Sequence, residues 1–200
     1  MQNNKSLALF DFDGTITTGD SLIGFLPHMV GFPRFVLGLF LLSPLLLAYL
    51  LKLIPNYKAK EKAFIHFFKN WDKTKFHEKA ASYSRESLPR QVKASALEKI
   101  KWHQAQGHRV ILISASMEAW LKPWCDSIGI ECIATLLETQ QGKITGRFLT
   151  KNCYGQEKVN RLKNHVDLTE YTEIYAYGDS RGDREMLELA GHSFYKLFRS

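Results

Sequence analysis

Short apolar runs near both ends of the chain are separated by a long stretch with a helical pattern. Residues 7–10 form an uncharged run that is followed at once by acids and a glycine, which is typical of a buried parallel strand ending in a tight loop. Residues 110–113 and 174–177 are further short, uncharged runs. The pattern therefore predicts three core strands.

Between the first two strands the periodicity is helical. Apolar residues recur on one helical face between residues 63 and 71, with lysines interleaved. Pro89 suits the start of a further helix and Gly107 its end. A plain crossover between parallel strands needs about a dozen residues, and this segment is several times longer. We expect later helices at residues 117–128, 155–165 and 183–189, an extended segment at 130–137, and a hairpin near Gly142.

This order of elements predicts an α/β protein with a Rossmann-like parallel sheet core and an inserted helical cap. A chain of 200 residues can form one domain that carries a large insertion. We expect residues 1–16 and 107–200 to form the core. Residues 17–106 then form the cap.

The composition indicates where in the cell the protein works and shows that its charge is unevenly distributed along the chain. The three cysteines have no metal-ligand spacing and the chain opens without a visible signal peptide, so we expect a cytoplasmic protein. The net charge is +7, and residues 52–109 hold 14 Lys and Arg against 5 Asp and Glu. Such a segment suits nucleic acid, acidic lipid headgroups or a phosphorylated substrate. A solvated helix surface is the simpler interpretation.

Two acids, Asp11 and Asp13, directly follow the first predicted strand. Functional groups of open α/β sheets gather at this carboxyl end. On a continued strand the two side chains would point to the same side, where they would repel each other unless they shared a cation. The pair therefore indicates a metal site, and a surface turn that ends the strand is the alternative.

Polar residues also follow the other two strands. Ser114 and Ala115 offer a hydroxyl and backbone N–H groups where a strand meets a helix, which favours phosphate binding, although serine is also a common helix cap. Asp179 and Asp183 follow the third strand and could share a helix face. Lys158 begins a helix, where a lone lysine is usually a surface residue.

If the three strands are neighbours, the four acids converge at one edge of the sheet. Oxygen ligands of this kind bind Mg²⁺, an ion that is usually shared with a substrate phosphate. Lys158 and Ser114 would then supply further positive charge and hydrogen-bond donors around the phosphoryl oxygens.

In this order the residues resemble the four signatures of the haloacid dehalogenase superfamily of phosphotransferases. These are an Asp-x-Asp-x-Thr loop (residues 11–15), a strand-end Ser or Thr (Ser114), a lysine (Lys158), and a Gly-Asp with a later Asp (residues 178–183). The insertion after the first signature, and the Gly-x-x-Lys that ends at Lys158, resemble the phosphoserine-phosphatase-like branch, subfamily IB, which has a C1-type helical cap.

The resemblance implies a role for each matching residue. Asp11 would attack phosphorus and become an aspartyl phosphate, and Asp13 would protonate the leaving oxygen and then activate water. Mg²⁺ would bind the carboxylates of Asp11 and Asp179 and the carbonyl of Asp13, with Asp183 orienting them. The transferring group would be held by Ser114, Lys158, Phe12 and Ala115. Asp20 matches the position where phosphoserine phosphatases hold the substrate amine.

Residues 35–51 contain no charge, and basic residues flank them on both sides. A single membrane crossing would separate Asp11 from Ser114, and two crossings need about 40 apolar residues. We therefore favour an apolar helical hairpin at about residues 22–54, bent near Ser43–Pro44, that dips into one leaflet of an anionic membrane. Burial in the cap core and a dimer interface are the alternatives.

This cap layout is similar to that of the phosphatidylglycerophosphatase C family. The resemblance suggests a lipid-headgroup phosphate as substrate, hydrolysed by a Mg²⁺-dependent phosphomonoesterase on the inner face of the cytoplasmic membrane, with no nucleic acid partner. A soluble phosphatase of small metabolites, phosphoserine among them, is the first alternative. A non-catalytic protein that uses its basic insertion to bind nucleic acid or acidic lipid is the second.

Overall fold

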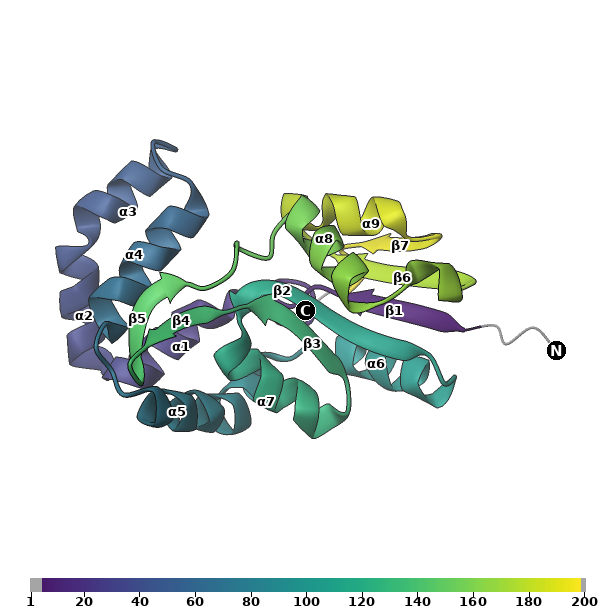
Figure 1. Cartoon of the computed structure of the whole chain (residues 1–200), viewed down its shortest axis with the longest axis horizontal. Helices are drawn as coiled ribbons and strands as arrows, with labels where there is room; N and C mark the ends of the chain where they lie inside the picture. The colour runs from purple at the N-terminus through teal and green to yellow at the C-terminus, as the bar shows by residue number, and fades with distance from the viewer. Residues whose placement is uncertain (1–4, 199–200) are drawn as a thin grey trace.

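A five-stranded parallel sheet forms the centre of the protein (Figure 1). The computed structural model describes residues 5–198, and the strands run in the order β3-β2-β1-β6-β7. This confirms the predicted α/β fold, and the three predicted strands are the central ones. Their bounds are β1 (Ser6–Phe10), β2 (Arg109–Met117) and β6 (Glu173–Gly178), with β3 (Glu131–Thr135) and β7 (His192–Tyr195) at the edges.

Helices cover both faces of the sheet, which explains why β1 is apolar throughout. Ala8 and Phe10 pack with α6 (Ala94–Ala105) and α7 (Glu118–Ile128). On the opposite face, alternate residues of β1 pack with α8 (Gln156–His165) and α9 (Arg184–Leu189). The carboxyl ends of the central strands stay free of these helices and point toward the inserted segment (Figure 1).

The insertion between β1 and β2 is helical, as predicted. It contains α1 (Ser21–Val30), α2 (Phe32–Leu41), α3 (Ser43–Leu50), α4 (Asn56–Phe68) and α5 (Lys73–Glu86), which are followed by a short 3-10 helix and by α6. The predicted apolar face of α4 is buried, and its Phe64 and the Phe25 ring of α1 both stack on Trp120 of α7. Pro89 lies in a short 3-10 helix before α6. The last helix of the insertion, α6, packs on β2 of the core. The boundary of the cap near residue 106 stays a prediction.

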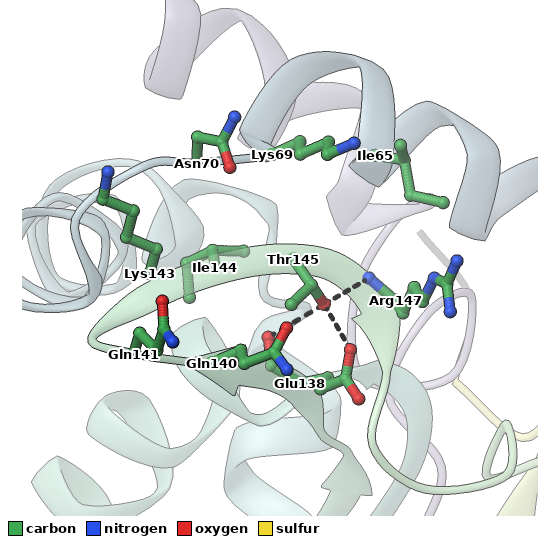
Figure 2. Close-up of a pocket in the computed structure, with 10 residues that line it drawn as sticks. All are labelled: Ile65, Lys69, Asn70, Glu138, Gln140, Gln141, Lys143, Ile144, Thr145 and Arg147. Carbon is green, nitrogen blue, oxygen red and sulfur yellow. Dashed lines mark hydrogen bonds between the residues drawn. The ribbon is translucent and has the colours of Figure 1, made fainter.

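A hairpin from the second half of the chain joins the cap (Figures 1 and 2). The antiparallel strands β4 (Leu137–Gln140) and β5 (Lys143–Phe148) lie against α4. Gly146 has a φ of +81°, and a Cβ there would lie 2.4 Å from the Cα of Ile65, so only glycine permits this approach. The N–H of Ile144 donates to the carbonyl of Trp71 at 2.8 Å. The sequence pattern predicted the hairpin but not its place.

The apolar segment at residues 35–51 is largely exposed. The side chains of Phe40 and Leu50 are 74% and 72% exposed, and α3 has no buried residue. Burial of α3 in the cap core is therefore wrong. The helix breaks at Leu42, next to the predicted bend, but the sharp turn, of 114°, separates α1 from α2.

Among the described residues, no helix alone has the length and apolar character needed to cross a bilayer. Only α1 and α2, taken together across their bend, meet that criterion.

Candidate active site

The loop after β1 is tied to the loop after β6. The N–H of Asp11 donates to the carbonyl of Tyr177 at 2.9 Å, which continues the β1–β6 pairing by one residue. Gly14 has a φ of +83°, and a Cβ there would lie 2.4 Å from the Oδ2 of Asp179. The glycine therefore permits the two acid-bearing loops to touch.

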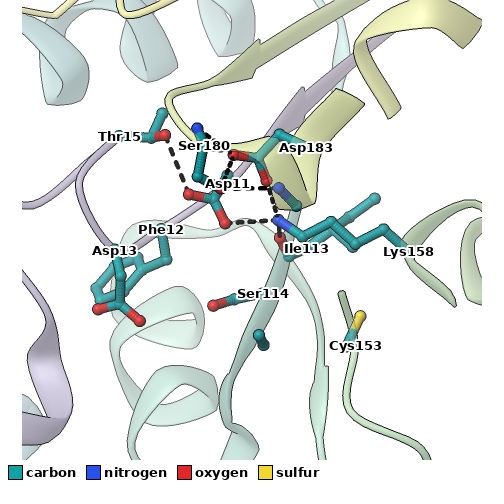
Figure 3. Close-up of polar contacts among 12 residues, drawn as sticks. Asp11, Phe12, Asp13, Thr15, Ile113, Ser114, Cys153, Lys158, Ser180 and Asp183 are labelled. Carbon is teal, nitrogen blue, oxygen red and sulfur yellow. Dashed lines mark hydrogen bonds and ion pairs between the residues drawn. The ribbon is translucent and has the colours of Figure 1, made fainter. Parts of the chain in front are cut away.

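Lys158 joins three parts of the core below these loops (Figure 3). Its Nζ donates to Asp11 Oδ1 at 2.5 Å, to Asp183 Oδ1 at 2.6 Å and to the carbonyl of Ile113 at 2.8 Å. The side chain comes from the first turn of α8 and is almost fully buried. A surface role for this lysine is therefore wrong, since all three of its N–H donors have partners.

Three acids form a compact cluster at the carboxyl edge of the sheet. Oxygen atoms of Asp11, Asp179 and Asp183 all lie within 4.8 Å of one another. The hydroxyl of Thr15 lies 3.0 Å from Asp11 Oδ2 and 3.2 Å from Asp179 Oδ1 and orients both carboxylates. Acids this close repel each other, and a donor set made only of oxygen atoms fits Mg²⁺.

Asp183 supports the cluster from behind. Its Oδ2 accepts hydrogen bonds from the N–H of Asp179 (3.1 Å), the N–H of Ser180 (2.9 Å) and the Ser180 hydroxyl (2.8 Å), while its Oδ1 is bonded to Lys158. With both oxygens already engaged, Asp183 fixes the loop after β6. Asp11 and Asp179 are the acids better placed to hold an ion.

The carboxylate of Asp13 points away from this cluster (Figure 3). Its Oδ1 accepts the N–H of Ser21 at 2.7 Å, and its Oδ2 accepts the Ser116 hydroxyl. The prediction that Asp11 and Asp13 point to the same side and share a cation is therefore wrong for the side chains. The reason is that β1 ends at Phe10, so the strand alternation does not extend to Asp13. A metal contact through its carbonyl stays a prediction.

Ser114 and Ala115 lie in an irregular part of β2. We predicted that this strand ends at Ser114, but it continues to Met117. Its pairing with β3 shifts in register between Ser114 and Met117. Ser114 is buried, and its Oγ accepts the N–H of Ser116 at 3.0 Å. Bulges of this kind redirect side chains next to active sites, and this one turns consecutive residues toward the loop after β1.

The remaining predicted residues have different environments. The Phe12 side chain is fully buried against Trp124, with ring centroids 5.3 Å apart, so it can reach a phosphate only through its backbone. Asp20 is exposed, and its Oδ1 caps α1 by accepting the N–H of Leu22 at 2.9 Å. The capping role accounts for the acid at this position without any substrate.

A cavity of about 550 Å³ connects the acids to the cap. It contains Asp11, Asp13, Asp20, Ser114, Ala115, Lys158 and Asp183 of the predicted set. Sequence reasoning missed its cap wall, which is Tyr49, Pro55, Asn56, Tyr57 and Lys60, and also Asn152, Tyr154 and Ser180. No local pattern marks these residues, because packing of the cap alone brings them over the acids. Thr15, which contacts Asp11 and Asp179, could have been identified from the sequence, because it belongs to the Asp-x-Asp-x-Thr motif.

Another cavity, of about 580 Å³, lies between α4 and the β4–β5 hairpin (Figure 2). It contains none of the predicted site residues. Its one acid, Glu138, accepts a hydrogen bond from the hydroxyl of Thr145 at 2.8 Å. We therefore place the chemistry in the cavity above the acid cluster.

Burial and ion pairing set the charges of the site. Burial raises the pKa of Asp11, and the ammonium of Lys158 opposes this effect. Burial lowers the pKa of Lys158, but Asp11 and Asp183 outweigh it and hold that pKa above the ordinary value. Burial also raises the pKa of Asp13, and the charge of Asp20 acts in the same direction. The lysine therefore stays charged, while burial raises the pKa of both acids that face the cavity from the loop after β1, that of Asp11 to about 7.

Comparison with known proteins agrees with this geometry. Residues 8–188 match the family model of haloacid dehalogenase-like hydrolases. The chain belongs to this family. The prediction of a phosphatase of this superfamily is thereby confirmed at the level of the family.

The most similar relatives include Protein CicA of Caulobacter vibrioides, which is 32% identical over all of this chain and 89% of its own length. A probable phosphatase of Mycobacterium tuberculosis is 33% identical over half of this chain and 36% of its own length. Among solved structures, a Bordetella pertussis protein of unknown function has a TM-score of 0.82 at 21% identity, over 94% of this chain and 88% of that one. A substrate-bound phosphoserine phosphatase has a TM-score of 0.61 at 18% identity, over 96% and 86%.

Proposed function

We propose that this protein hydrolyses phosphomonoesters through an aspartyl phosphate on Asp11 and depends on Mg²⁺. The observation that carries the proposal is the contact of Lys158 with both Asp11 and Asp183 inside the three-acid cluster. Lys158 holds one carboxylate oxygen of Asp11 and the Thr15 hydroxyl lies beside the other, so the carboxylate is fixed where it lines the cavity. A positioned, buried carboxylate is suited to nucleophilic attack on phosphorus.

Asp11 and Asp179 would hold the ion, with Asp183 fixing their loop. When bound, Mg²⁺ supplies charge neutralisation between these acids and the phosphoryl oxygens. Lys158 keeps its positive charge in the buried site and stabilises negative charge that develops on the transferring group. Ser114 and the backbone of Ala115, in the bulge of β2, bind the remaining phosphoryl oxygens.

Asp13 acts as the general acid and then as the general base. It lines the same cavity as Asp11 but is held separately by Ser21 and Ser116. Its raised pKa favours the protonated form that donates to the leaving oxygen. Once the alcohol has left, the same carboxylate accepts a proton from the water that hydrolyses the intermediate.

The substrate class that we favour is a lipid-headgroup phosphate, such as phosphatidylglycerol phosphate, met at an anionic membrane surface. The cavity wall includes Tyr49 and Tyr57, at the end of α3 and the start of α4, beside the exposed apolar surface. Residues 21–60 contain four Lys and Arg and no acid, which suits anionic headgroups. A soluble phosphatase of small metabolites is the alternative, and a non-catalytic binding role is disfavoured because each catalytic residue type is present.

The test is release of phosphate from a generic aryl phosphate with and without Mg²⁺. We expect turnover with the metal, loss of turnover with a chelator, and a fall in kcat of at least about a thousandfold for Asp11→Asn. A 32P-labelled substrate, quenched in acid, should leave label on the wild-type chain and none on the variant. Equal turnover by Asp11→Asn would end the hypothesis.

The lipid substrate is tested separately, by comparing phosphatidylglycerol phosphate, lysophosphatidate, phosphoserine and sugar phosphates at one Mg²⁺ concentration. A preference for the two lipids would support a lipid-headgroup phosphate as the substrate. A preference for phosphoserine or a sugar phosphate would favour the soluble alternative.

A further inference from the structure

Lys93 is the residue directly before α6, the helix that packs on β2. Its Nζ donates to the carbonyl of Gly14 at 2.6 Å and to the carbonyl of Phe198 at 3.0 Å. The side chain is half-buried, and it is not one of the residues that line the cavity above the acid cluster. Lys93 therefore holds the loop after β1 from outside the cavity.

The backbone of Lys93 pairs with the chain segment that leads from this loop into α1. The N–H of Lys93 donates to the carbonyl of Ile16 at 2.8 Å, and Thr17 and Val92 form an antiparallel bridge beside this bond. The side chain and the backbone of Lys93 thus both bond the segment just after the two acids. This double attachment fixes the direction in which the ammonium extends.

Gly14, the residue held by Lys93, is where the loop after β1 touches the loop after β6. A Cβ at this position would lie 2.4 Å from Asp179 Oδ2. The N–H of Gly14 donates to the Thr17 hydroxyl at 3.3 Å, and its carbonyl accepts from Lys93. A glycine backbone has wide conformational freedom, so these two bonds fix how closely Asp11 and Asp179 approach each other.

The second acceptor of the Lys93 ammonium is itself anchored. Phe198 is 8% exposed, and its ring centroid lies 6.3 Å from that of Phe10 and 5.5 Å from that of Tyr177. These two rings lie at or next to the carboxyl ends of β1 and β6, which lead into the acid-bearing loops. The ammonium is therefore held by a packed part of the core and cannot simply follow the loop.

The charge of Lys93 also reaches the acid cluster. Burial raises the pKa of Asp179, and the ammonium of Lys93 opposes this effect. A positive charge beside a cation site weakens the binding of a divalent ion. A residue that holds the metal-binding groups in place strengthens that binding. The two effects of Lys93 on metal affinity thus have opposite signs.

We propose that Lys93 is a positioning residue of the metal site, and that its hold on Gly14 outweighs the repulsion of its charge. The inference rests on the proposed function, because it assumes that Asp11 and Asp179 hold Mg²⁺. Loss of a group that orients metal ligands typically lowers metal affinity by about 10- to 100-fold. Loss of the positive charge alone would raise the affinity, so the sign of the change decides between the two effects.

The experiment measures metal binding without turnover. Mn²⁺, which takes the same oxygen ligands as Mg²⁺, is titrated into the protein, its free fraction is read by electron paramagnetic resonance, and Mg²⁺ is added as a competitor. Asp179→Asn identifies the binding that belongs to the cluster. Wild type is compared with Lys93→Met and with Lys93→Arg, which keeps the charge and the donors. Lys101→Met is the matched control, because Lys101 is exposed on α6.

We expect Lys93→Met to weaken the binding of both ions about tenfold. Lys93→Arg should restore most of the affinity, and Lys101→Met should leave it unchanged. Equal or tighter binding by Lys93→Met would overturn this inference alone. Absence of binding by wild type would overturn the inference together with the metal dependence of the proposed hydrolase.

Two further measurements separate positioning from a structural role or from substrate binding. Circular dichroism under the titration conditions gives the folded fraction of Lys93→Met, and an affinity that is unchanged once corrected for this fraction would overturn the inference. In phosphate release, Lys93→Met should raise the apparent constant for Mg²⁺ about tenfold and leave KM for an aryl phosphate unchanged, since Lys93 does not line the cavity. A rise in KM with an unchanged constant for Mg²⁺ would contradict the proposal.

Discussion

The acid cluster and the α2–α3 surface both reverse the ordinary distribution of residues, in opposite ways. At the cluster, charged groups are buried: Asp11, Lys158 and Asp183 are 7%, 1% and 1% exposed. On the α2–α3 surface, large apolar groups are exposed, among them Phe40 and Leu50. The first region is satisfied from within, because each buried charge has a partner of opposite sign. On the α2–α3 surface, no other side chains among the described residues bury these apolar groups.

The contrast separates a region that belongs to the folded state from a surface that is available for association. Buried charges are tolerated when they are paired and hydrogen-bonded, so the cluster is part of the folded state itself. An exposed apolar patch adds nothing to folding and instead marks a surface for association. Changes in the cluster should therefore alter the stability of the protein, and changes on the α2–α3 surface should alter its association.

The largest expected effect is that of Lys158→Met. The substitution leaves Asp11 and Asp183 buried without their cation, which typically destabilises a protein by about 3–5 kcal/mol. Urea unfolding followed by circular dichroism measures the loss, and Lys163→Met, on an exposed part of the same helix, should change little. Adding Asp183→Asn should recover part of the loss. An unchanged unfolding midpoint for Lys158→Met would show that the ion pairs of the cluster do not stabilise the fold.

A smaller effect is expected from His103, a buried group that has no opposite charge. Its ring nitrogens lie 2.8 Å from His108 Nδ1 and 2.9 Å from the Tyr177 hydroxyl, and burial lowers its pKa to about 4.

Because the unfolded chain takes up this proton near pH 6.5, the stability contributed by the neutral ring is present above that pH. It is lost as the pH falls toward 4. The melting temperature of the wild type should therefore decrease over this window, and His103→Gln should flatten the decrease. Identical pH profiles for the two proteins would show that another group is responsible.

The smallest effect on stability is expected on the α2–α3 surface. Phe40→Ser with Leu50→Ser should change the free energy of unfolding by only about 0.5 kcal/mol, since both side chains are already exposed. Sedimentation with vesicles containing phosphatidylglycerol should show binding by wild type and clearly weaker binding by the double variant. Gel filtration of both proteins distinguishes a dimer interface. Unchanged vesicle binding, or a dimer lost on substitution, would contradict the membrane proposal.

The strands and most of the acid cluster could be predicted because their signals are local. An apolar run that ends in acids identifies a strand and its carboxyl end together, as at Phe10 and Tyr177. Spacing along the chain could not show the direction of the Asp13 side chain, which depends on loop dihedrals after β1. Nor could it show Lys60, which reaches the site only because α4 packs over it.

The placement of the β4–β5 hairpin follows the same rule. Its turn at Gln141–Gly142 is a local signal, whereas its contact with α4 depends on tertiary packing. The exposure of α3 agrees with the favoured surface hairpin over burial in the cap core, because residues 35–51 lack the polar positions at helical period that a soluble cap needs.

The hairpin also restricts how the cavity can open. Beyond its two covalent connections, the cap is bonded to β5 through Asn70 and Trp71, and β5 leads directly into the chain segment before α8 and Lys158. The hairpin therefore ties the cap to the part of the chain that continues to α8 and Lys158. A displacement of the cap away from the acid cluster would have to carry the β4–β5 hairpin with it or break these backbone hydrogen bonds.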